Sequence, residues 1–286
     1  MTLRNILKIT FVTLSLLSIY FIAISQTPPI RGDGREYILM SQSFIKHGSS
    51  NLELKDAKDV IKSFKSNNQS FADHVLDCDK NSDCGITMLS GAYFPSNDGK
   101  LFSYHFSFYP LMNIPAYIAA MHFSLAPTTS FYITNTIFLL TSLFFILFYL
   151  RDSVGHRALI TFLLVSQTTL LYLKWPHPEI MTISLMIVAM CLIKRGMFYL
   201  SSFVFAISSL QYQPLGIVSA LVIIYGFVSS LKSNDIKSIG QLLSKPKVIS
   251  NAALISILSG LVVLTPSLFY MYHFSSPNII ASKGGG

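Results

Sequence analysis

The chain has 286 residues, of which 51% are apolar and only 12% are charged. A soluble domain carries about twice that charged fraction, so the composition argues against a soluble globular protein. The net charge of +8 does not indicate nucleic-acid binding, because Lys and Arg lie in short clusters between long apolar runs, as in membrane proteins. We therefore expect an all-α fold, a polytopic transmembrane helix bundle that forms a single membrane domain over residues 1–286.

The first apolar run covers residues 7–24 and starts beside two basic residues, Arg4 and Lys8. A cleaved signal peptide is the alternative, but the sequence Ser25-Gln26-Thr27-Pro28-Pro29 lacks a small-x-small cleavage site. We therefore predict an uncleaved first span with a cytoplasmic N-terminus. The polar residues that follow it then form a long loop on the outer side of the membrane.

Residues 33–47 have the pattern of an amphipathic helix on the membrane surface, with apolar residues every three or four positions and Gly48 as a stop. Two carboxylates, Asp33 and Glu36, open this helix. Their spacing resembles a capping box, in which both would bind helix amides. The alternative is a carboxylate pair that acts as a general base or metal ligand. Spacing alone favours the cap.

Residues 51–73 are charged and periodic and predict a solvated helix. Cys78 and Cys84 follow, and they are the only cysteines outside the apolar runs. On the oxidising side of a membrane a disulfide between them is expected. Residues 77–83 also alternate Asp and Asn as in a calcium loop, although Ser82 stands where such a loop has glycine.

The apolar run 106–124 contains Pro110, Asn113, Pro115 and His122, a poor composition for a span that faces lipid. If this run crossed the membrane, all short basic loops would lie opposite the N-terminus, against the usual charge bias. We therefore predict a second surface helix over 106–124, on or dipping into the outer face.

Seven spans remain, and they place the short basic loops 151–157, 194–195 and 232–247 on the inner side. The outer side then carries the loop 26–128, the turns 174–179 and 211–214, and the tail from His273. Polar groups from several outer segments would form one shared site. The predicted spans are 7–24, 129–150, 158–173, 179–193, 197–211, 214–231 and 250–271.

The order of features along the chain, and two short motifs within it, resemble the GT-C superfamily of membrane glycosyltransferases. The resemblance is closest to the bacterial relatives of the aminoarabinose and protein O-mannosyl transferases. Asp33-Gly34-Arg35-Glu36-Tyr37 stands where that family has an acidic motif after its first span. The segment 104–111, Tyr-His-Phe-Ser-Phe-Tyr-Pro-Leu, resembles the segment before the family's second surface helix. The family usually has adjacent carboxylates, whereas Gly34 and Arg35 intervene here. Its members are also longer, so we expect this chain to be an N-terminal part.

The resemblance implies transfer of a sugar from a polyprenyl-phosphate donor to a lipid, glycan or protein acceptor outside a bacterial inner membrane. Asp33 would be the catalytic base, with Glu36 beside it. The metal is unknown, and a divalent ion is one option for the cofactor. The expected partners are the lipid-linked donor and membrane lipids, without nucleic acid. The residues expected to bind substrate, and above all the leaving phosphate, are Arg35, Tyr104, His105, Lys174, His177 and Glu179.

Several of these residues also have a purely structural interpretation, which stays open. Tyr104 and His105 also fit an aromatic belt at the membrane interface. Glu179 also fits a helix start, where negative charge is favoured. A non-enzymatic transporter or flippase partner of envelope polysaccharide export is the rival function, although ionisable groups are few within the spans. A lipid-linked polymer ligase would use the same donors.

Overall fold

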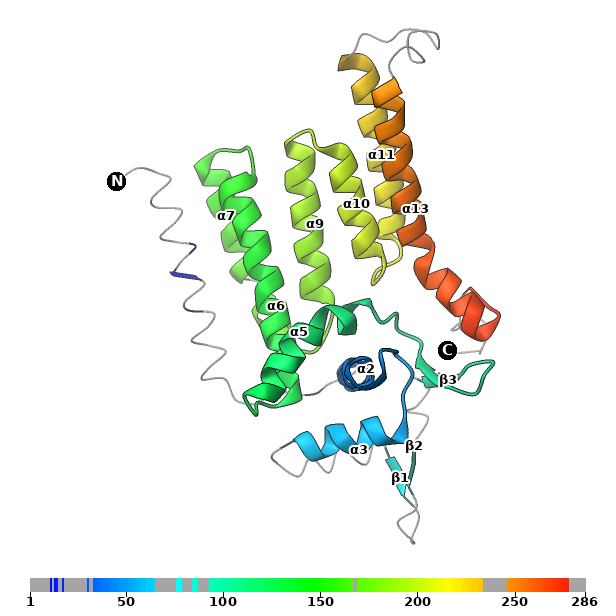
Figure 1. Cartoon of the computed structure of the whole chain (residues 1–286). Coiled ribbons are helices and arrows are strands. Elements are labelled where there is room, and N and C mark those ends of the chain that lie inside the picture. The colour runs from blue at the N-terminus through cyan, green and yellow to red at the C-terminus, as the bar shows by residue number, and fades with distance from the viewer. Residues whose placement is uncertain are drawn as a thin grey trace. The chain divides into compact units, whose positions relative to one another are not determined.

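The computed structural model describes residues 33–64, 93–166, 169–233 and 246–277, the backbone of 76–78 and 84–86, and a few single positions before residue 31. The described chain is mostly helical (Figure 1). A π-helical turn, η2 (Phe145–Tyr149), continues α6 directly. The helices are α2 (Gly34–His47), α3 (Leu54–Ser63), α5 (Phe108–His122), α6 (Pro127–Phe144), α7 (Val154–Ser166), α8 (Thr169–Leu173), α9 (Glu179–Lys194), α10 (Phe198–Ser209), α11 (Leu215–Ser233) and α13 (Pro246–Phe274).

Three described helices are long and apolar enough to cross a membrane, judged by length and composition: Pro127–Tyr149, Leu215–Lys232 and Ala252–Phe274. They coincide with the predicted spans 129–150, 214–231 and 250–271. The other described segments are shorter. α9 has 16 residues and α10 has 12, which correspond to about 24 and 18 Å of helix, below the roughly 30 Å of a bilayer core.

Two predicted spans have a different outcome. The span 158–173 is divided between α7 and the five-residue α8. The span 7–24 lies almost entirely outside the described residues. A crossing of seven helices therefore remains a prediction, and three membrane-capable helices are what the described chain contains.

Two short antiparallel hairpins correct the expectation of an all-α fold. β1 (Leu76–Cys78) pairs with β2 (Cys84–Ile86), and β3 (Tyr93–Pro95) pairs with β4 (Leu101–Ser103). The β1–β2 register sets Cys78 opposite Cys84. Their side chains, and the rest of the proposed calcium loop, lie outside the described residues, so the disulfide stays a prediction.

The helix predicted over 33–47 is present as α2, which ends at Gly48, and its placement on the membrane surface stays a prediction. Gly48 takes a left-handed φ of 69°, which glycine adopts without steric cost, and its N–H donates to the Phe44 carbonyl. The second helix is shorter than the predicted 51–73 and is only partly solvated. α3 spans ten residues and buries one face through Ala57 and Val60.

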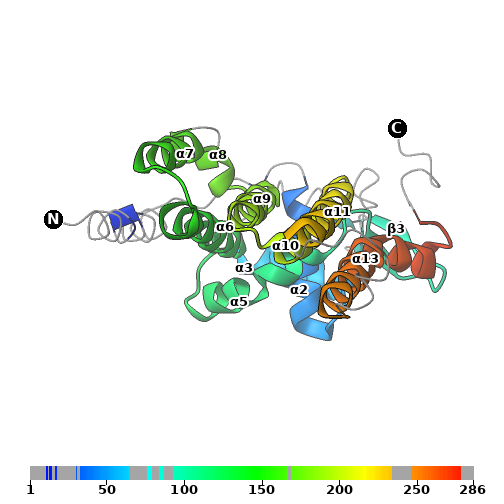
Figure 2. The same cartoon turned by 90° about the horizontal axis from the view of Figure 1, so that it is seen from above.

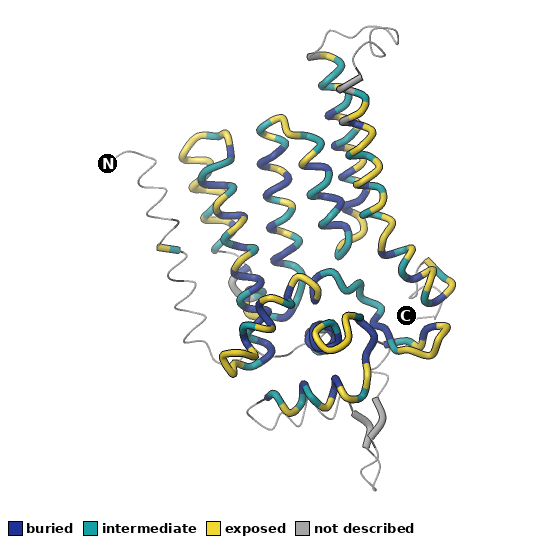
Figure 3. The backbone as a smooth tube through the Cα atoms, in the orientation of Figure 1, coloured by how far each residue is buried: buried dark blue, intermediate teal, exposed yellow. Residues whose placement is uncertain are grey.

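The chain divides into two compact units, which are described separately. The first contains residues 138–167 and 180–265 together with the first 16 residues. In it, α10 and α11 pack side by side (Figures 1 and 2), and the hydroxyls of Ser202 and Ser219 lie 2.9 Å apart between them. Small polar residues of this kind allow close helix approach within membranes. Exposed residues recur along α11 and along the part of α13 in this unit (Figure 3), and they include large apolar residues such as Leu221, Ile224, Leu254 and Ile257.

Two arginines lie at one end of the first unit. The Arg157 guanidinium donates to the Leu147 carbonyl at 2.8 Å, and Arg195 Nε donates to the Tyr149 carbonyl at 2.5 Å. Positive groups near helical carbonyl ends are favourable. The two basic loops 151–157 and 194–195 thus meet the same end of the segment Pro127–Tyr149, as expected for loops that share one side.

The second unit comprises residues 17–137, 168–179 and 266–286. Within it α2 packs between α3 and α5 and is buried along most of its length (Figure 3). α5 occupies the place of the predicted surface helix 106–124. Its Asn113 faces the protein, where it is fully buried and hydrogen-bonds Ser41, Ser130 and Thr134, while His122 at the end of the helix is exposed. Its apolar residues Leu111, Met112, Ile118 and Met121 are exposed, which is the pattern of a helix that contacts lipid.

Candidate functional site

Asp33 lies directly before α2, but its carboxylate does not cap the helix. Asp33 Oδ2 is instead 3.0 Å from His105 Nε2, on the segment between β4 and α5. The capping-box interpretation of Asp33 and Glu36 is therefore wrong, because a partner far along the chain takes the carboxylate that local spacing assigned to the helix amides.

Glu36 lies one turn further along α2, and its carboxylate is buried. Ser103 Oγ, at the end of β4, donates to Glu36 Oε2 at 2.6 Å and accepts the backbone N–H of His105 at 3.0 Å. Tyr93, on the paired strand, donates to the Glu36 carbonyl at 3.3 Å. The β3–β4 hairpin thus fixes the position of His105 relative to both carboxylates.

The two carboxylates have opposite pKa shifts. The contact with His105 lowers the pKa of Asp33, against the opposing effect of its partial burial. Burial raises the pKa of Glu36 to about 7, and the hydrogen bond from Ser103 only partly opposes this. At neutral pH Asp33 is therefore ionised, while Glu36 is divided between its two forms. Carboxyl groups whose pKa values are pushed apart are typical of acid–base sites.

Aromatic rings surround the pair. The ring of Tyr104 lies 3.9 Å from that of His105, and the buried Tyr37 ring lies 5.4 Å from it. Tyr104 is itself held in place, because Tyr270 near the end of α13 donates to its carbonyl at 2.6 Å. The imidazole therefore has little freedom to rotate away from Asp33. Only part of each side chain is exposed, 39% for Asp33 and 21% for His105.

The turn 174–179 packs against the start of α2. A Cβ on Gly34 would lie only 2.4 Å from Pro176 Cγ, so the glycine allows this close approach. Asn135 of α6 holds the turn from the other side, since its amide donates to the carbonyls of Tyr172, Leu173 and Trp175.

This packing brings one more predicted residue to the cluster. His177 is near enough to Asp33 to act on its charge, and it lies 6.2 Å from Tyr37 ring to ring. His177 Nδ1 is 3.7 Å from Glu179 Oε1, at the start of α9. The structure therefore gathers Asp33, Glu36, Tyr104, His105 and His177 in one place, with Glu179 at its margin.

Two predicted substrate ligands behave differently. Arg35 is on the first turn of α2 next to Asp33, and it makes no ion pair among the described residues. Lys174 is exposed and has no ion pair in the described part of the chain.

Ser103 and Asn135 were missed by the sequence analysis. A polar Asn135 inside an apolar run was a usable signal, whereas nothing local distinguishes Ser103.

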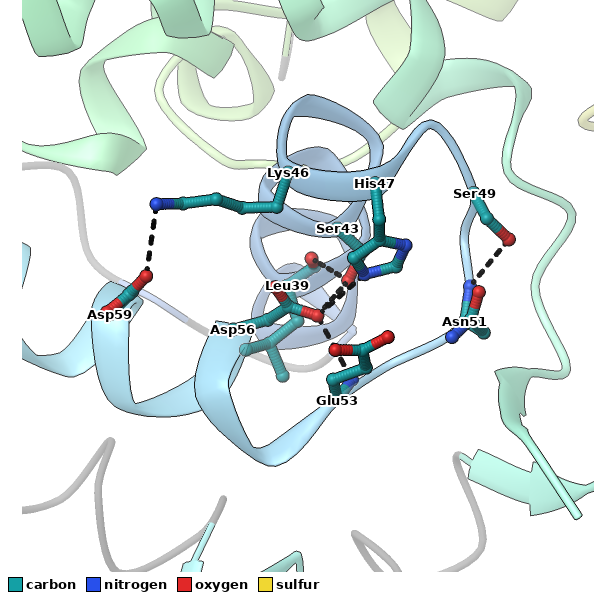
Figure 4. A network of polar contacts seen from close by, with 9 residues as sticks. All are labelled: Leu39, Ser43, Lys46, His47, Ser49, Asn51, Glu53, Asp56 and Asp59. Atoms are coloured by element: carbon teal, nitrogen blue, oxygen red, sulfur yellow. Dashed lines mark hydrogen bonds and ion pairs between the residues drawn. The ribbon is translucent and has the colours of Figure 1, made fainter.

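Two groups of described residues have ligand atoms close enough for one metal ion. One is Asp33, Glu36 and His105, whose ligand atoms lie within 4.8 Å of one another. The other is His47, Glu53 and Asp56 (Figure 4).

The second group has a structural explanation. Glu53 and Asp56 form the capping box of α3, and Asp56 Oδ2 also accepts from Ser43 and contacts His47 at 2.9 Å. Its donors and acceptors are thus already used within the protein. The cluster around Asp33 remains the candidate site.

Comparisons with protein-family models, curated proteins and solved structures found no match for this chain, so its functional assignment rests on the geometry and chemistry of the residues around Asp33.

Proposed function

We propose that the chain is a membrane glycosyltransferase of the GT-C type, with seven spans, which transfers a sugar from a polyprenyl-phosphate donor on the outer face of the membrane. One observation carries the proposal. The acidic motif after the first apolar run and the aromatic segment before α5 meet in space, with Asp33 and His105 3.0 Å apart. The resemblance to that superfamily rests on the same two segments.

Contacts between distant segments support the proposed topology. The turn 174–179 meets the start of α2 at Gly34, and the β3–β4 turn meets the end of α13, where Asn97 N–H donates to the His273 carbonyl at 2.8 Å. Loops that connect membrane spans can contact one another only when they lie on the same side. These contacts therefore support an arrangement in which the long loop, the turn 174–179 and the end of α13 share a side, as in the seven-span proposal.

The residues can be assigned to steps of the transfer. The bond between the sugar C1 and the donor phosphate oxygen breaks, and C1 bonds to the acceptor oxygen or nitrogen. Asp33, ionised and half-exposed, takes the proton of the acceptor. Polyprenyl phosphate leaves with both electrons of the broken bond. The Arg35 guanidinium donates to its oxygens, since charged donors bind phosphate strongly, and the imidazole N–H groups of His105 and His177 are further donors.

A lipid-phosphate donor also fits the surroundings of the cluster. Such a donor stays at the membrane surface, so its site must lie near the end of membrane-capable helices. The cluster around Asp33 meets this condition, because it is in contact with the end of one such helix. Tyr270, near the end of Ala252–Phe274, bonds the residue next to His105.

The test is sugar transfer by the purified full chain in nanodiscs. The donor is a radiolabelled polyprenyl-phosphate sugar, and the acceptors are lipid and glycan extracts of bacterial membranes. The proposal predicts a labelled acceptor together with free polyprenyl phosphate. The rival function, a flippase or transport partner, predicts movement of the donor between leaflets with the label still on its lipid. That second result, with no labelled acceptor, would overturn the transferase.

A further inference from the structure

A groove of about 520 Å³ lies on the second unit, away from the cluster around Asp33. It is formed by the last turns of α2, the last turns of α3 and the second half of α5. The transfer chemistry described above uses none of its lining residues. We call it the α2–α3–α5 groove.

One side of the groove is apolar. Ile45, Ile118 and Met121 line it, and all three are open to the outside, with Ile118 53% exposed. Ile118 and Met121 belong to the outward face of α5, which is apolar along the helix. An exposed apolar helix face on a chain with membrane-capable helices fits lipid chains better than water.

The other side of the groove is charged. Lys46 and Lys62 line it together with one carboxylate, Asp59. Lys46 Nζ is 3.2 Å from Asp59 Oδ2 (Figure 4), and Lys62 is exposed with no ion pair among the described residues. Two lysines and one aspartate give the lining a net charge of +1, which complements a single phosphodiester.

The groove also lies close, along the chain, to a segment that could cross the membrane. Met121 precedes the membrane-capable segment Pro127–Tyr149 by only six residues. The apolar lining is therefore close to the point where the chain would enter the hydrocarbon region, and the lysines would lie at the level of lipid head groups.

We propose that the α2–α3–α5 groove binds an anionic phospholipid of the outer leaflet, whose phosphate contacts Lys46 and Lys62 and whose upper acyl chain lies along Ile45, Ile118 and Met121. This lipid is a resident of the membrane and not the sugar donor. The site would fix α5 on the membrane surface. The site rests on the proposed topology, which assigns the outer leaflet, but it requires no transferase activity, so it can hold or fail independently of the proposed reaction.

Native mass spectrometry of the full chain in detergent tests the proposal, with dioleoyl-phosphatidylglycerol as probe and dioleoyl-phosphatidylcholine as the neutral comparison. Wild type should bind the anionic lipid preferentially. Each lysine near an anionic head group contributes a factor of about five, so Lys46→Ala with Lys62→Ala should weaken binding roughly 25-fold. Lys62→Ala alone, which breaks no described ion pair, should weaken it about fivefold.

The matched control removes two other lysines of α3, Lys55 and Lys58, which are exposed and do not line the groove. Their replacement by alanine removes the same charge and should change binding less than twofold. A second variant, Ile118→Ser with Met121→Ser, should also weaken lipid binding. In a separate experiment on wild type, inorganic phosphate should fail to displace the lipid. Equal losses in the two lysine pairs, displacement by phosphate, or equal binding of the neutral lipid would each overturn the proposal.

Discussion

The contact between α2 and the turn 174–179 gives the sharpest structural prediction. In Gly34→Ala the new Cβ would be 2.4 Å from Pro176 Cγ. Carbon atoms in contact normally stay about 3.5–4.0 Å apart, so the two segments must separate by about 1 Å. The proline ring is rigid, and Pro176 is buried, so it cannot simply swing aside. Overpacking of this kind costs about 1–3 kcal/mol.

A helix gains at most about 1 kcal/mol when an interior glycine becomes alanine, and less at its first residue, so Gly34→Ala should be destabilising overall. The assay is heat unfolding of the purified chain in detergent, followed by circular dichroism. We expect the midpoint to fall by roughly 2–6 °C. Gly155→Ala is the matched control. It also lies in the first turn of a helix, α7, but a Cβ there meets nothing within 4 Å.

A double-mutant cycle separates the contact from other effects of the alanine. Pro176→Ala removes the Cγ atom and leaves a Cβ that is 3.5 Å from the new methyl group, an ordinary contact. The cost of Gly34→Ala should therefore largely disappear in the Pro176→Ala background, with a coupling energy of about 1–2 kcal/mol. If Gly34→Ala unfolds like Gly155→Ala, or if its cost is unchanged without the proline ring, the turn does not pack on α2 as described.

Three further predictions concern charge, packing and topology. Burial raises the pKa of Glu36 from 4.5 to about 7, so the folded protein holds this proton more tightly than the unfolded chain does. The resulting stabilisation is fully present below pH 4.5 and is lost as the pH rises from 4.5 through 7. Over this range the free energy of unfolding of wild type should fall by up to about 3 kcal/mol. Unfolding measured across this range should show that slope, and Glu36→Gln should remove it; an equal slope in both proteins would contradict the burial of the carboxyl. Asn113→Ala breaks the three buried side-chain hydrogen bonds that join α5 to α2 and α6, so unfolding in detergent should show a loss of about 2–3 kcal/mol, against less than about 0.5 for the exposed Asn97→Ala. In a background without native cysteines, an impermeant thiol reagent applied outside should label Lys174→Cys and not Ser153→Cys, and the reverse pattern would refute the seven-span arrangement.

α2 could be predicted from local signals, whereas α3 is much shorter than the charged, periodic segment 51–73 suggested. α2 begins and ends where its apolar spacing and the following Gly48 indicate, because both signals act within one or two turns. The β3–β4 hairpin was not predicted. Asn97-Asp98-Gly99 is a strong turn signal, but strands of three residues are too short for an alternating pattern to be recognised.

The composition of the candidate site was predicted better than its contacts. Asp33, Glu36 and His105 were selected from two separate motifs, and the structure places them together. The role of Asp33 as a helix cap was wrong because spacing along a helix contains no information about a partner such as His105. The same limit applies to Ser103, whose hydrogen bond to Glu36 depends on the pairing of β4 with β3.

α5 shows a related limit. Its prolines and Asn113 appeared unsuited to lipid contact, yet the asparagine is buried against α2 and α6 and the exposed face is apolar. Composition averages over all faces of a helix, whereas only the structure shows which face is outside. A helix is present at the predicted place in the sequence, whereas its position on the membrane surface stays a prediction that the pattern of burial supports.

Asp33→Asn most directly tests the assignment of the cluster as the catalytic site. Transfer from a polyprenyl-phosphate sugar should be measured for wild type, for Asp33→Asn and for Asp98→Asn, whose exposed carboxylate pairs with Lys100 in the β3–β4 turn. The loss of a general base should lower the rate of Asp33→Asn about 100-fold or more, with an unfolding midpoint close to that of wild type. Asp98→Asn should keep near-normal transfer. Wild-type transfer rates in a folded Asp33→Asn protein would contradict the assignment.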